Sequence, residues 1–236
     1  MKKRLKINGI IMFLAFVVVV SFPAIFLRTE NIVLNLWDQA AEIFGIVFIL
    51  LGQLFRVSAR GFKAENSKEG FALVESGPYS LVRNPMYLGI FFIGLGIVLV
   101  LFKWWALAIF IVVFIIRYVT LMLKEEKKLV ESFPQLYPAY CRKVPRRIIP
   151  TLSSLLDKDI SEYLPLRLAW INREVGSIVA VLLLTIIVKM WTDIKRGPAI
   201  YLKELSIVLG VILLFLCFIL YLNWKTSRQR NETTKR

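Results

Sequence analysis

The sequence predicts an all-α integral membrane protein with about six transmembrane helices. Three observations support this fold class: the chain of 236 residues is 58% hydrophobic, its mean hydropathy is +0.67, and long apolar runs alternate with charged segments. A soluble domain of this length does not need so much apolar surface. The basic residues behind the net charge of +15 lie between the apolar runs, so they match anionic lipid headgroups rather than nucleic acid.

Six apolar runs are long enough to be membrane spans. They cover approximately residues 10–27, 36–55, 86–102, 104–123, 175–191 and 199–222. The first run follows a basic start, as in a signal peptide, but no small-residue cleavage site comes after it, so we expect a retained anchor. The break near residue 103 is short and aromatic, which predicts a helical hairpin that turns at the membrane interface.

Lysine and arginine are distributed unequally between the two sides of the membrane that these spans define. The segments assigned to one side hold 24 of them and those assigned to the other side hold five, while Arg117 and Lys203 lie in or near spans. The positive-inside bias predicts that the side with 24 is cytoplasmic. Both termini and the segments 56–85 and 124–173 are then cytoplasmic. The oligomeric state does not follow from the sequence.

This layout divides the chain into three regions. We expect residues 1–35 to form an N-terminal transmembrane anchor, and residues 36–150 to form a membrane core. Residues 151–236 form an amphipathic linker, a C-terminal transmembrane hairpin and a basic tail. Within the core, the segments 56–85 and 124–150 carry polar, aromatic and proline residues and adjoin spans. We therefore expect these two segments to form a binding region at the cytoplasmic surface of the bilayer.

The residue types in the chain limit the chemistry of such a site. There is no histidine, which removes the usual general base and the commonest metal ligand. The two cysteines, Cys141 and Cys217, are far apart, so we expect neither a disulfide framework nor a zinc site. The remaining candidates are carboxylates, tyrosine, arginine, asparagine, backbone groups or a bound cofactor.

The first candidate segment is GPYSLVRNPMYLG, residues 77–89. Gly-Pro forms a turn, and Asn84-Pro85 ends any preceding helix and starts the next. The free amides of that helix N-terminus bind an anionic group, and the rings of Tyr79 and Tyr87 suit a cationic sulfonium. The alternative interpretation is a turn, a helix cap and an aromatic belt at the headgroup level.

The second candidate segment contains Glu125 and Glu126, at the end of the fourth span. If the helix ends there, the two carboxylates oppose the helix dipole, and binding of a ribose or an amino group would explain them. The alternative is that the helix continues and the carboxylates pair with neighbouring lysines. Arg117 lies about two turns inside the same span, where a charge requires a partner or a watery cavity. A substrate carboxylate is one candidate partner.

Together these elements resemble the isoprenylcysteine carboxyl methyltransferase and phospholipid methyltransferase superfamily. The shared order is a Gly-Pro-Tyr turn, Arg-Asn-Pro-x-Tyr opening a membrane helix, a helical hairpin, Glu-Glu, Phe-x-x-x-Tyr-x-x-Tyr, and a basic stretch ending in Ile-Pro. Residues 133–140 and 146–150 supply the last two elements. The resemblance covers approximately residues 40–150 and makes the region 36–150 a methyltransferase-like membrane core.

The resemblance implies a methyltransferase whose cofactor is S-adenosylmethionine, bound on the cytosolic side between membrane helices and their connecting loops. The acceptor it implies is a lipid or a prenylated molecule that enters laterally from the bilayer. The residues that it implies as cofactor contacts are Phe71, Ala72, Leu73, Val74, Tyr79, Arg83, Asn84, Pro85, Met86, Tyr87 and Glu125.

Two departures from the isoprenylcysteine enzymes concern the acceptor. Those enzymes have histidine where this chain has Asn84, and they have an arginine for the substrate carboxylate where this chain has Leu121. Arg117, one turn further into the membrane, is the candidate substitute for that arginine. Glu126 is the candidate group to take the proton of an amine acceptor. We therefore name Arg117 and Glu126 as the catalytic candidates.

Methyl transfer from a sulfonium needs alignment more than acid-base chemistry, which suits a chain without histidine. A carboxylate acceptor needs no general base, so we expect carboxyl O-methylation of an isoprenylcysteine-type substrate. One alternative is N-methylation of a phospholipid amine. Two others are a non-catalytic lipid-binding or scaffold protein and a membrane reductase that uses a nicotinamide cofactor. Product analysis separates O-methylation from N-methylation, and binding of S-adenosylmethionine separates both of these activities from a scaffold.

Overall fold

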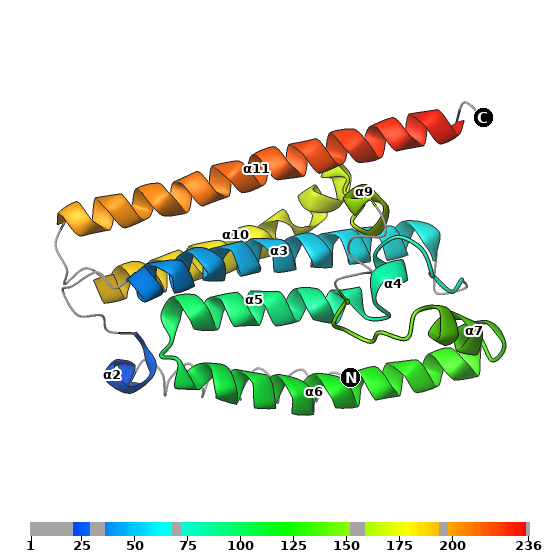
Figure 1. Cartoon of the computed structure of the whole chain (residues 1–236), viewed down its shortest axis with the longest axis horizontal. Coiled ribbons are helices and arrows are strands. Elements are labelled where there is room, and N and C mark those ends of the chain that lie inside the picture. Colours follow the sequence, from blue (N-terminus) through cyan, green and yellow to red (C-terminus); the bar gives the residue numbers. More distant parts are fainter. Residues whose placement is uncertain (1–20, 29–35, 68–71, 152–158, 194–197, 235–236) are drawn as a thin grey trace.

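The computed structural model describes residues 21–28, 36–67, 72–151, 159–193 and 198–234. These residues are helical apart from connecting segments and one isolated β-bridge between Leu27 and Phe102. The helices are α2 (Pro23–Phe26), α3 (Leu36–Asn66), α4 (Pro78–Leu81), α5 (Pro85–Leu101), α6 (Trp105–Ser132), α7 (Leu136–Lys143), α9 (Ile160–Tyr163), α10 (Leu168–Asp193) and α11 (Pro198–Thr234). The long helices α3, α5, α6, α10 and α11 pack side by side as an elongated bundle, with α4, α7 and α9 towards one end (Figure 1).

Four helices in the described ranges are long and apolar enough to cross a membrane: α3, α6, residues 168–190 of α10 and residues 208–228 of α11. Helix α5 is also apolar but has 17 residues, fewer than the ~20 that usually span a bilayer. The first predicted span falls mostly outside the described residues. The structure therefore confirms an all-α membrane protein but does not confirm a count of about six spans.

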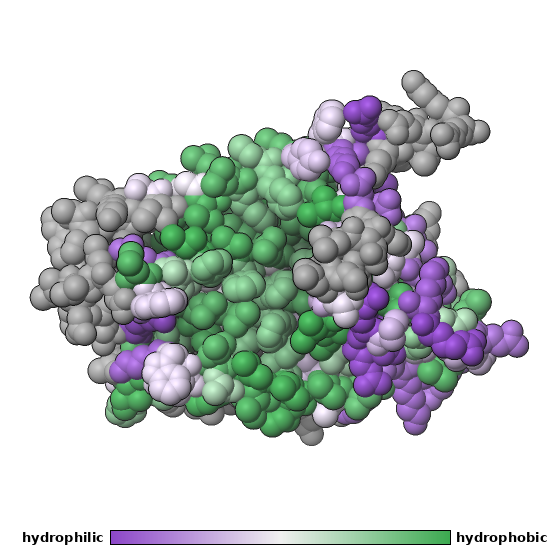
Figure 2. Space-filling model, viewed as in Figure 1, coloured by the Kyte–Doolittle hydropathy of each residue, from purple (hydrophilic) through white to green (hydrophobic). Residues whose placement is uncertain are grey.

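Three helices extend past the apolar runs that predicted them. Helix α3 continues from residue 55 to Asn66, α6 continues from residue 123 to Ser132, and α10 begins at Leu168 rather than near residue 175. Backbone hydrogen bonding does not depend on apolar side chains, so a helix continues beyond the membrane until the chain turns. Figure 2 shows the resulting hydrophilic surface beside the apolar band. We call this end, which carries α4, α7 and the C-terminal ends of α3 and α6, the site end.

Four glycines bring the antiparallel helices α3 and α5 into close contact. A Cβ on Gly52 would lie 2.5 Å from the carbonyl oxygen of Gly89, and a Cβ on Gly96 would collide with the carbonyl oxygen of Gly45. The two contacts, Gly45 with Gly96 and Gly52 with Gly89, are seven residues apart on each helix, so they lie on one face of each helix. Small residues allow this backbone approach, which drives helix association in membranes.

Aromatic side chains connect α5 to α6. The ring centroids of Phe91 and Phe114 lie 5.0 Å apart, and those of Phe114 and Tyr118 lie 4.4 Å apart. Tyr87, in the first turn of α5, lies 5.4 Å from Tyr118. Outside this contact, α6 presents exposed apolar side chains such as Ile116, as expected of a helix that faces lipid. The aromatic contacts therefore fix α6 against the N-terminal turn of α5, where the candidate site lies.

Candidate functional site

The stretch of residues 77–89 forms a turn, the short helix α4 and the start of α5. Gly77 has a φ of +60°, in the left-handed region that favours glycine, and Pro78 and Pro85 open the two helices. Asn84 is the N-cap of α5, yet its side chain makes no capping hydrogen bond. Its Nδ2 atom is buried and has no hydrogen-bond partner among the described residues. This amide is therefore available to a bound molecule.

The two carboxylates on α6 have different partners. Because α6 continues to Ser132, Glu125 and Glu126 do not lie at a helix end. The alternative of a continuing helix is thus confirmed, and the condition for the argument from the helix dipole is not met. The side chains of Glu125 and Tyr87 are joined by a hydrogen bond, in which the hydroxyl donates to the carboxylate. The oxygens of Glu126 lie 3.3 Å from Arg83 Nη1 and 3.3 Å from Arg147 Nη2. These partners come from other segments and are not the neighbouring lysines.

Arg83 joins the start of α5 to α7 and to the segment that follows α7. Its Nη1 donates to Cys141 Sγ at 3.1 Å, and its Nη2 donates to the carbonyl oxygen of Pro145 at 3.1 Å. The backbone amides of Arg83 and Asn84 donate to the carbonyl oxygens of Arg146 and Arg147, both at 2.9 Å. These bonds hold the two predicted segments side by side. Sequence reasoning placed Arg83 at the cofactor but missed this connecting role.

Three tyrosines pack together beside α4. Tyr140 donates from its hydroxyl to the carbonyl oxygen of Tyr79 at 2.8 Å, and Tyr137 and Tyr140 are each 3% exposed. Burial raises the pKa of Tyr79, and the charge of Glu125 raises it further. Burial likewise raises the pKa of Tyr137 and of Tyr140. At neutral pH these phenols are protonated, so they act as hydrogen-bond donors and ring surfaces.

The remaining predicted cofactor residues flank this cluster. Leu73 packs against Tyr137 and Tyr140, and Ala72 is held through its carbonyl oxygen, which accepts a hydrogen bond of 2.6 Å from Ser67. Val74 and Pro85 are buried, and Met86 is half-buried. Phe71 lies outside the described residues.

Arg117 is on a different face of α6 from the three residues of that helix that line a pocket, Val119, Met122 and Leu123. Its side chain is exposed and has no hydrogen bond or ion pair with any residue the structure describes. At 100° per residue, it lies about 120° to 160° around the helix from Val119, Met122 and Leu123. The structure therefore does not bring Arg117 to the pocket that these three residues line.

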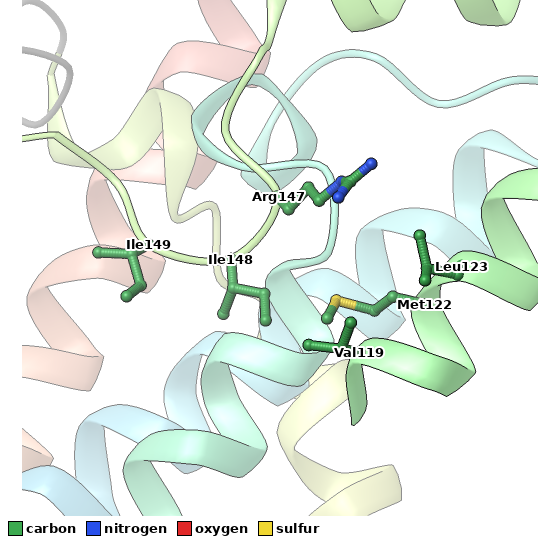
Figure 3. Close-up of a pocket in the computed structure, with 6 residues that line it drawn as sticks. All are labelled: Val119, Met122, Leu123, Arg147, Ile148 and Ile149. Carbon is green, nitrogen blue, oxygen red and sulfur yellow. The ribbon is translucent and has the colours of Figure 1, made fainter. Parts of the chain in front are cut away.

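That pocket lies between α6 and the segment after α7 and has a volume of about 340 Å³. Its lining residues are Val119, Met122, Leu123, Arg147, Ile148 and Ile149. Figure 3 shows Ile148 pointing towards Val119 and Met122, with the Arg147 side chain above them. The pocket is apolar except for one guanidinium, and it sits where the apolar part of α6 gives way to charged residues. In the sequence, the only indication of this pocket was the basic stretch ending in Ile-Pro, which contains Arg147, Ile148 and Ile149.

One comparison with known proteins gave a match. Residues 40–135 match the phospholipid methyltransferase family. This confirms the resemblance over a range that includes the α3–α5 contact, the Tyr87–Glu125 hydrogen bond and the Arg83–Glu126 ion pair. It leaves out Tyr137, Tyr140, the Arg147 side of the pocket and the C-terminal helices. The curated proteins and the solved structures gave no match to the chain.

The match makes the region similar to membrane methyltransferases that act on lipids, which generally use S-adenosylmethionine. The donor set fits that molecule. Arg83 Nε and Asn84 Nδ2 are buried without hydrogen-bond partners in the described part of the chain, whereas Glu126 Oε1 is buried and ion-paired with Arg83. Glu125 supplies a carboxylate that accepts a hydrogen bond from Tyr87 and whose charge acts on Tyr79, so both tyrosines lie near it. Such a set suits the carboxylate, ammonium, ribose and sulfonium groups of the cofactor.

Proposed function

We propose that this protein transfers a methyl group from S-adenosylmethionine to a lipid-like acceptor at the site end. The observation that carries the proposal is the meeting of the α5 N-terminus with α6. There the unpartnered amide of Asn84 and the Tyr87–Glu125 hydrogen bond come from two segments that both lie within the matched residues 40–135. The apolar pocket opens beside them on the same helix.

The residues at this meeting point have separate roles in the proposal. Asn84 Nδ2 and the positive end of the α5 dipole bind the cofactor carboxylate. Glu125 accepts hydrogen bonds from the ribose or the amino group. The rings of Tyr79 and Tyr87 lie against the sulfonium side and the adenine. Leu73 and Val74 close the site from the α4 side.

Bound S-adenosylmethionine would supply an activated methyl group. The task of the protein is then to hold the acceptor atom in line with that methyl group and to exclude water. Val119, Met122 and Ile148 form the apolar wall that excludes water beside the acceptor. Arg147 fixes the position of an anionic group on the acceptor. The acceptor enters from the bilayer because this part of α6 faces lipid.

The acceptor that we propose is an isoprenylcysteine-type carboxylate, which becomes a methyl ester. A carboxylate needs no general base, and the described site contains no group suited to be one except the two carboxylates. The apolar pocket accommodates part of an isoprenyl chain, and Arg147 pairs with the carboxylate. The isoprenylcysteine enzymes bind the substrate carboxylate with an arginine at the position of Leu121. In this arrangement Arg147, rather than Arg117, takes over that role.

N-methylation of a phospholipid amine is the second candidate. The matched family is named for phospholipid methyltransferases, and a lipid phosphate would pair with Arg147 as well as a carboxylate does. An amine acceptor must lose a proton. Glu125 is exposed beside Tyr87 and is better placed to take it than Glu126, whose oxygens face two guanidinium groups.

The first experiment measures binding of S-adenosylmethionine to the detergent-purified full chain by calorimetry. We expect binding in the micromolar range, about −8 kcal/mol, which Glu125→Ala and Tyr87→Ala abolish. Glu131→Ala is the matched control, because Glu131 is an exposed carboxylate on the same helix. A folded wild-type protein that does not bind the cofactor would overturn the proposal.

The second experiment identifies the acceptor. The protein is incubated with methyl-labelled cofactor and either a farnesylated cysteine derivative or phosphatidylethanolamine vesicles. A methyl ester releases its label as methanol in mild base, whereas an N-methyl group keeps it. Base-labile label in the first incubation supports O-methylation. Base-stable label in the second favours the phospholipid amine instead.

A further inference from the structure

The described C-terminal region, residues 159–193 and 198–234, lies outside the matched range, and the proposed function gives it no role. It is fastened to α3 by ion pairs at both ends of the bundle. At the site end, Glu174 pairs with Arg56 and Arg60. At the opposite end, Lys189 pairs with Glu42, and both side chains are nearly buried. Figure 1 shows α10 and α11 beside α3 on the side away from α6.

Trp170 packs tightly against α3 at the site end. Its Nε1 donates to Glu65 Oε1 at 2.7 Å, and its ring lies against Gly61, where a Cβ would collide with the indole. The guanidinium of Arg167 lies 5.1 Å from the centre of the same ring and pairs with Glu65. Trp170 is 3% exposed. Its position is thus fixed by a hydrogen bond, a cation–π contact and close packing.

The segment before Trp170 lies against α4. Ser58 on α3 donates from its hydroxyl to the carbonyl oxygen of Pro165 at 2.6 Å, which holds the segment next to α3. Leu164 and Leu166 pack in one buried cluster with Leu81 and Val82 at the end of α4. Leu166 and Val82 are completely buried. Helices α4 and α9 are also in contact. The segment Tyr163–Leu166 of the C-terminal region therefore packs against α4, and we call this segment the wall.

Helix α4 carries Tyr79, so this wall bears on the candidate cofactor site. Tyr79 is also held by its own hydroxyl, which donates to the carbonyl oxygen of Ala59 on α3 at 3.4 Å, and by the hydroxyl of Tyr140, which donates to the carbonyl oxygen of Tyr79. A helix of four residues has little intrinsic stability. Its position is set by the elements that pack against it.

We propose that Trp170 and the segment Tyr163–Leu166 are positioning residues for α4, and that they set the affinity of the site for its cofactor. This inference rests on the proposed function for the identity of the ligand. The C-terminal helices would then belong to the working enzyme, although the matched family region ends before them. The wall acts on Tyr79 and the turn that precedes Asn84, without touching the cofactor itself.

The test compares the two ends of the same helix pair. Trp170→Ala removes the anchor at the site end, and Ser58→Ala removes a single hydrogen bond there. Lys189→Met removes the ion pair at the opposite end and serves as the matched control for general destabilisation. Trp170→Phe keeps a ring against Gly61 and is the conservative variant. Each full-length protein is measured for its melting temperature, for its dissociation constant for S-adenosylmethionine, and for hydrogen exchange of residues 77–84.

We expect Trp170→Ala to weaken cofactor binding roughly tenfold and to speed exchange of residues 77–84, with partial recovery in Trp170→Phe and a smaller effect in Ser58→Ala. We expect Lys189→Met to lower the melting temperature while leaving both properties unchanged. If Trp170→Ala and Lys189→Met change the exchange of residues 77–84 equally, or if neither variant changes it, the inference is wrong. Wild-type protein that fails to bind the cofactor refutes the proposed function, and the exchange comparison still decides the positioning role.

Discussion

Arg83 Nη1 and Glu126 Oε1 lie 3.3 Å apart, with side chains that are only 11% and 12% exposed. The pair joins the start of α5 to α6, and Arg147 approaches the second oxygen of the same carboxylate. Two cations from separate segments thus converge on one acid beside the candidate cofactor site. The pair has a structural role in addition to any part in chemistry.

Glu126→Ala should destabilise the protein, because it leaves the guanidinium of Arg83 nearly buried without its carboxylate. Breaking a buried pair from one side costs about 3 kcal/mol. The measurement is the free energy of unfolding in mixed micelles. The double variant Arg83→Met with Glu126→Met should lose less unfolding free energy than the sum of the losses in the single variants Arg83→Met and Glu126→Met. Additive losses would show that the two side chains do not interact.

Gly52→Val should separate α3 from α5 and lower the stability of the whole bundle. Its Cβ would meet the carbonyl oxygen of Gly89 at 2.5 Å, and backbone atoms cannot move aside without shifting a helix. Overpacking of this kind costs about 2 kcal/mol. Gly210→Val is the matched control, since no atom lies within 4 Å of a Cβ placed there. Equal melting temperatures for the two variants would contradict the close approach.

Arg147→Gln should raise the KM for the lipid acceptor, because Arg147 supplies the one charge in the pocket lining. Losing a charge-assisted hydrogen bond corresponds to roughly a 10-fold change. Arg117→Gln, on another face of α6, should leave this KM unchanged. Affinity for S-adenosylmethionine is measured in both variants as a check on the neighbouring site. If Arg117→Gln has the larger effect on the acceptor KM, the substrate carboxylate lies at Arg117 as the sequence first suggested.

The buried tyrosines predict a loss of stability at alkaline pH. Burial raises the pKa values of Tyr79, Tyr137 and Tyr140, so above about pH 10, the ordinary tyrosine pKa, the unfolded chain releases protons that the folded chain keeps. Their contribution to stability is fully present below that pH and falls as the pH rises towards the folded pKa values. Melting temperatures and phenolate absorbance between about pH 8 and 12 measure this.

Tyr140→Phe gives the matched comparison for that titration. It should remove one of the raised pKa values and the 2.8 Å hydrogen bond to Tyr79, at a cost of about 1 kcal/mol near neutral pH. Its stability should then fall less steeply in alkali than that of the wild-type protein. Parallel curves would mean that Tyr140 titrates as it does in water.

Local sequence was enough to predict the turn and the start of α5. Gly77 has a φ in the left-handed region, and Pro78 and Pro85 fix the first turns of α4 and α5. Asn84 is restricted because it precedes a proline. Each conformation therefore follows from the residue itself or from its neighbour. The membrane class followed equally directly, because apolar runs of sufficient length have few other structures open to them. The order of the motifs then identified the methyltransferase resemblance.

The sequence by itself therefore determined the membrane class, the turn before α5 and the residues of the two candidate segments. Only the tertiary structure decided that Glu126 faces Arg83 and Arg147, that Arg117 lies away from the pocket, and that Trp170 supports α4. The physical reason is distance along the chain. A turn depends on neighbouring residues, whereas a pocket, an ion pair or a supporting wall depends on which helix faces pack together, and that is fixed by contacts such as Gly52 with Gly89.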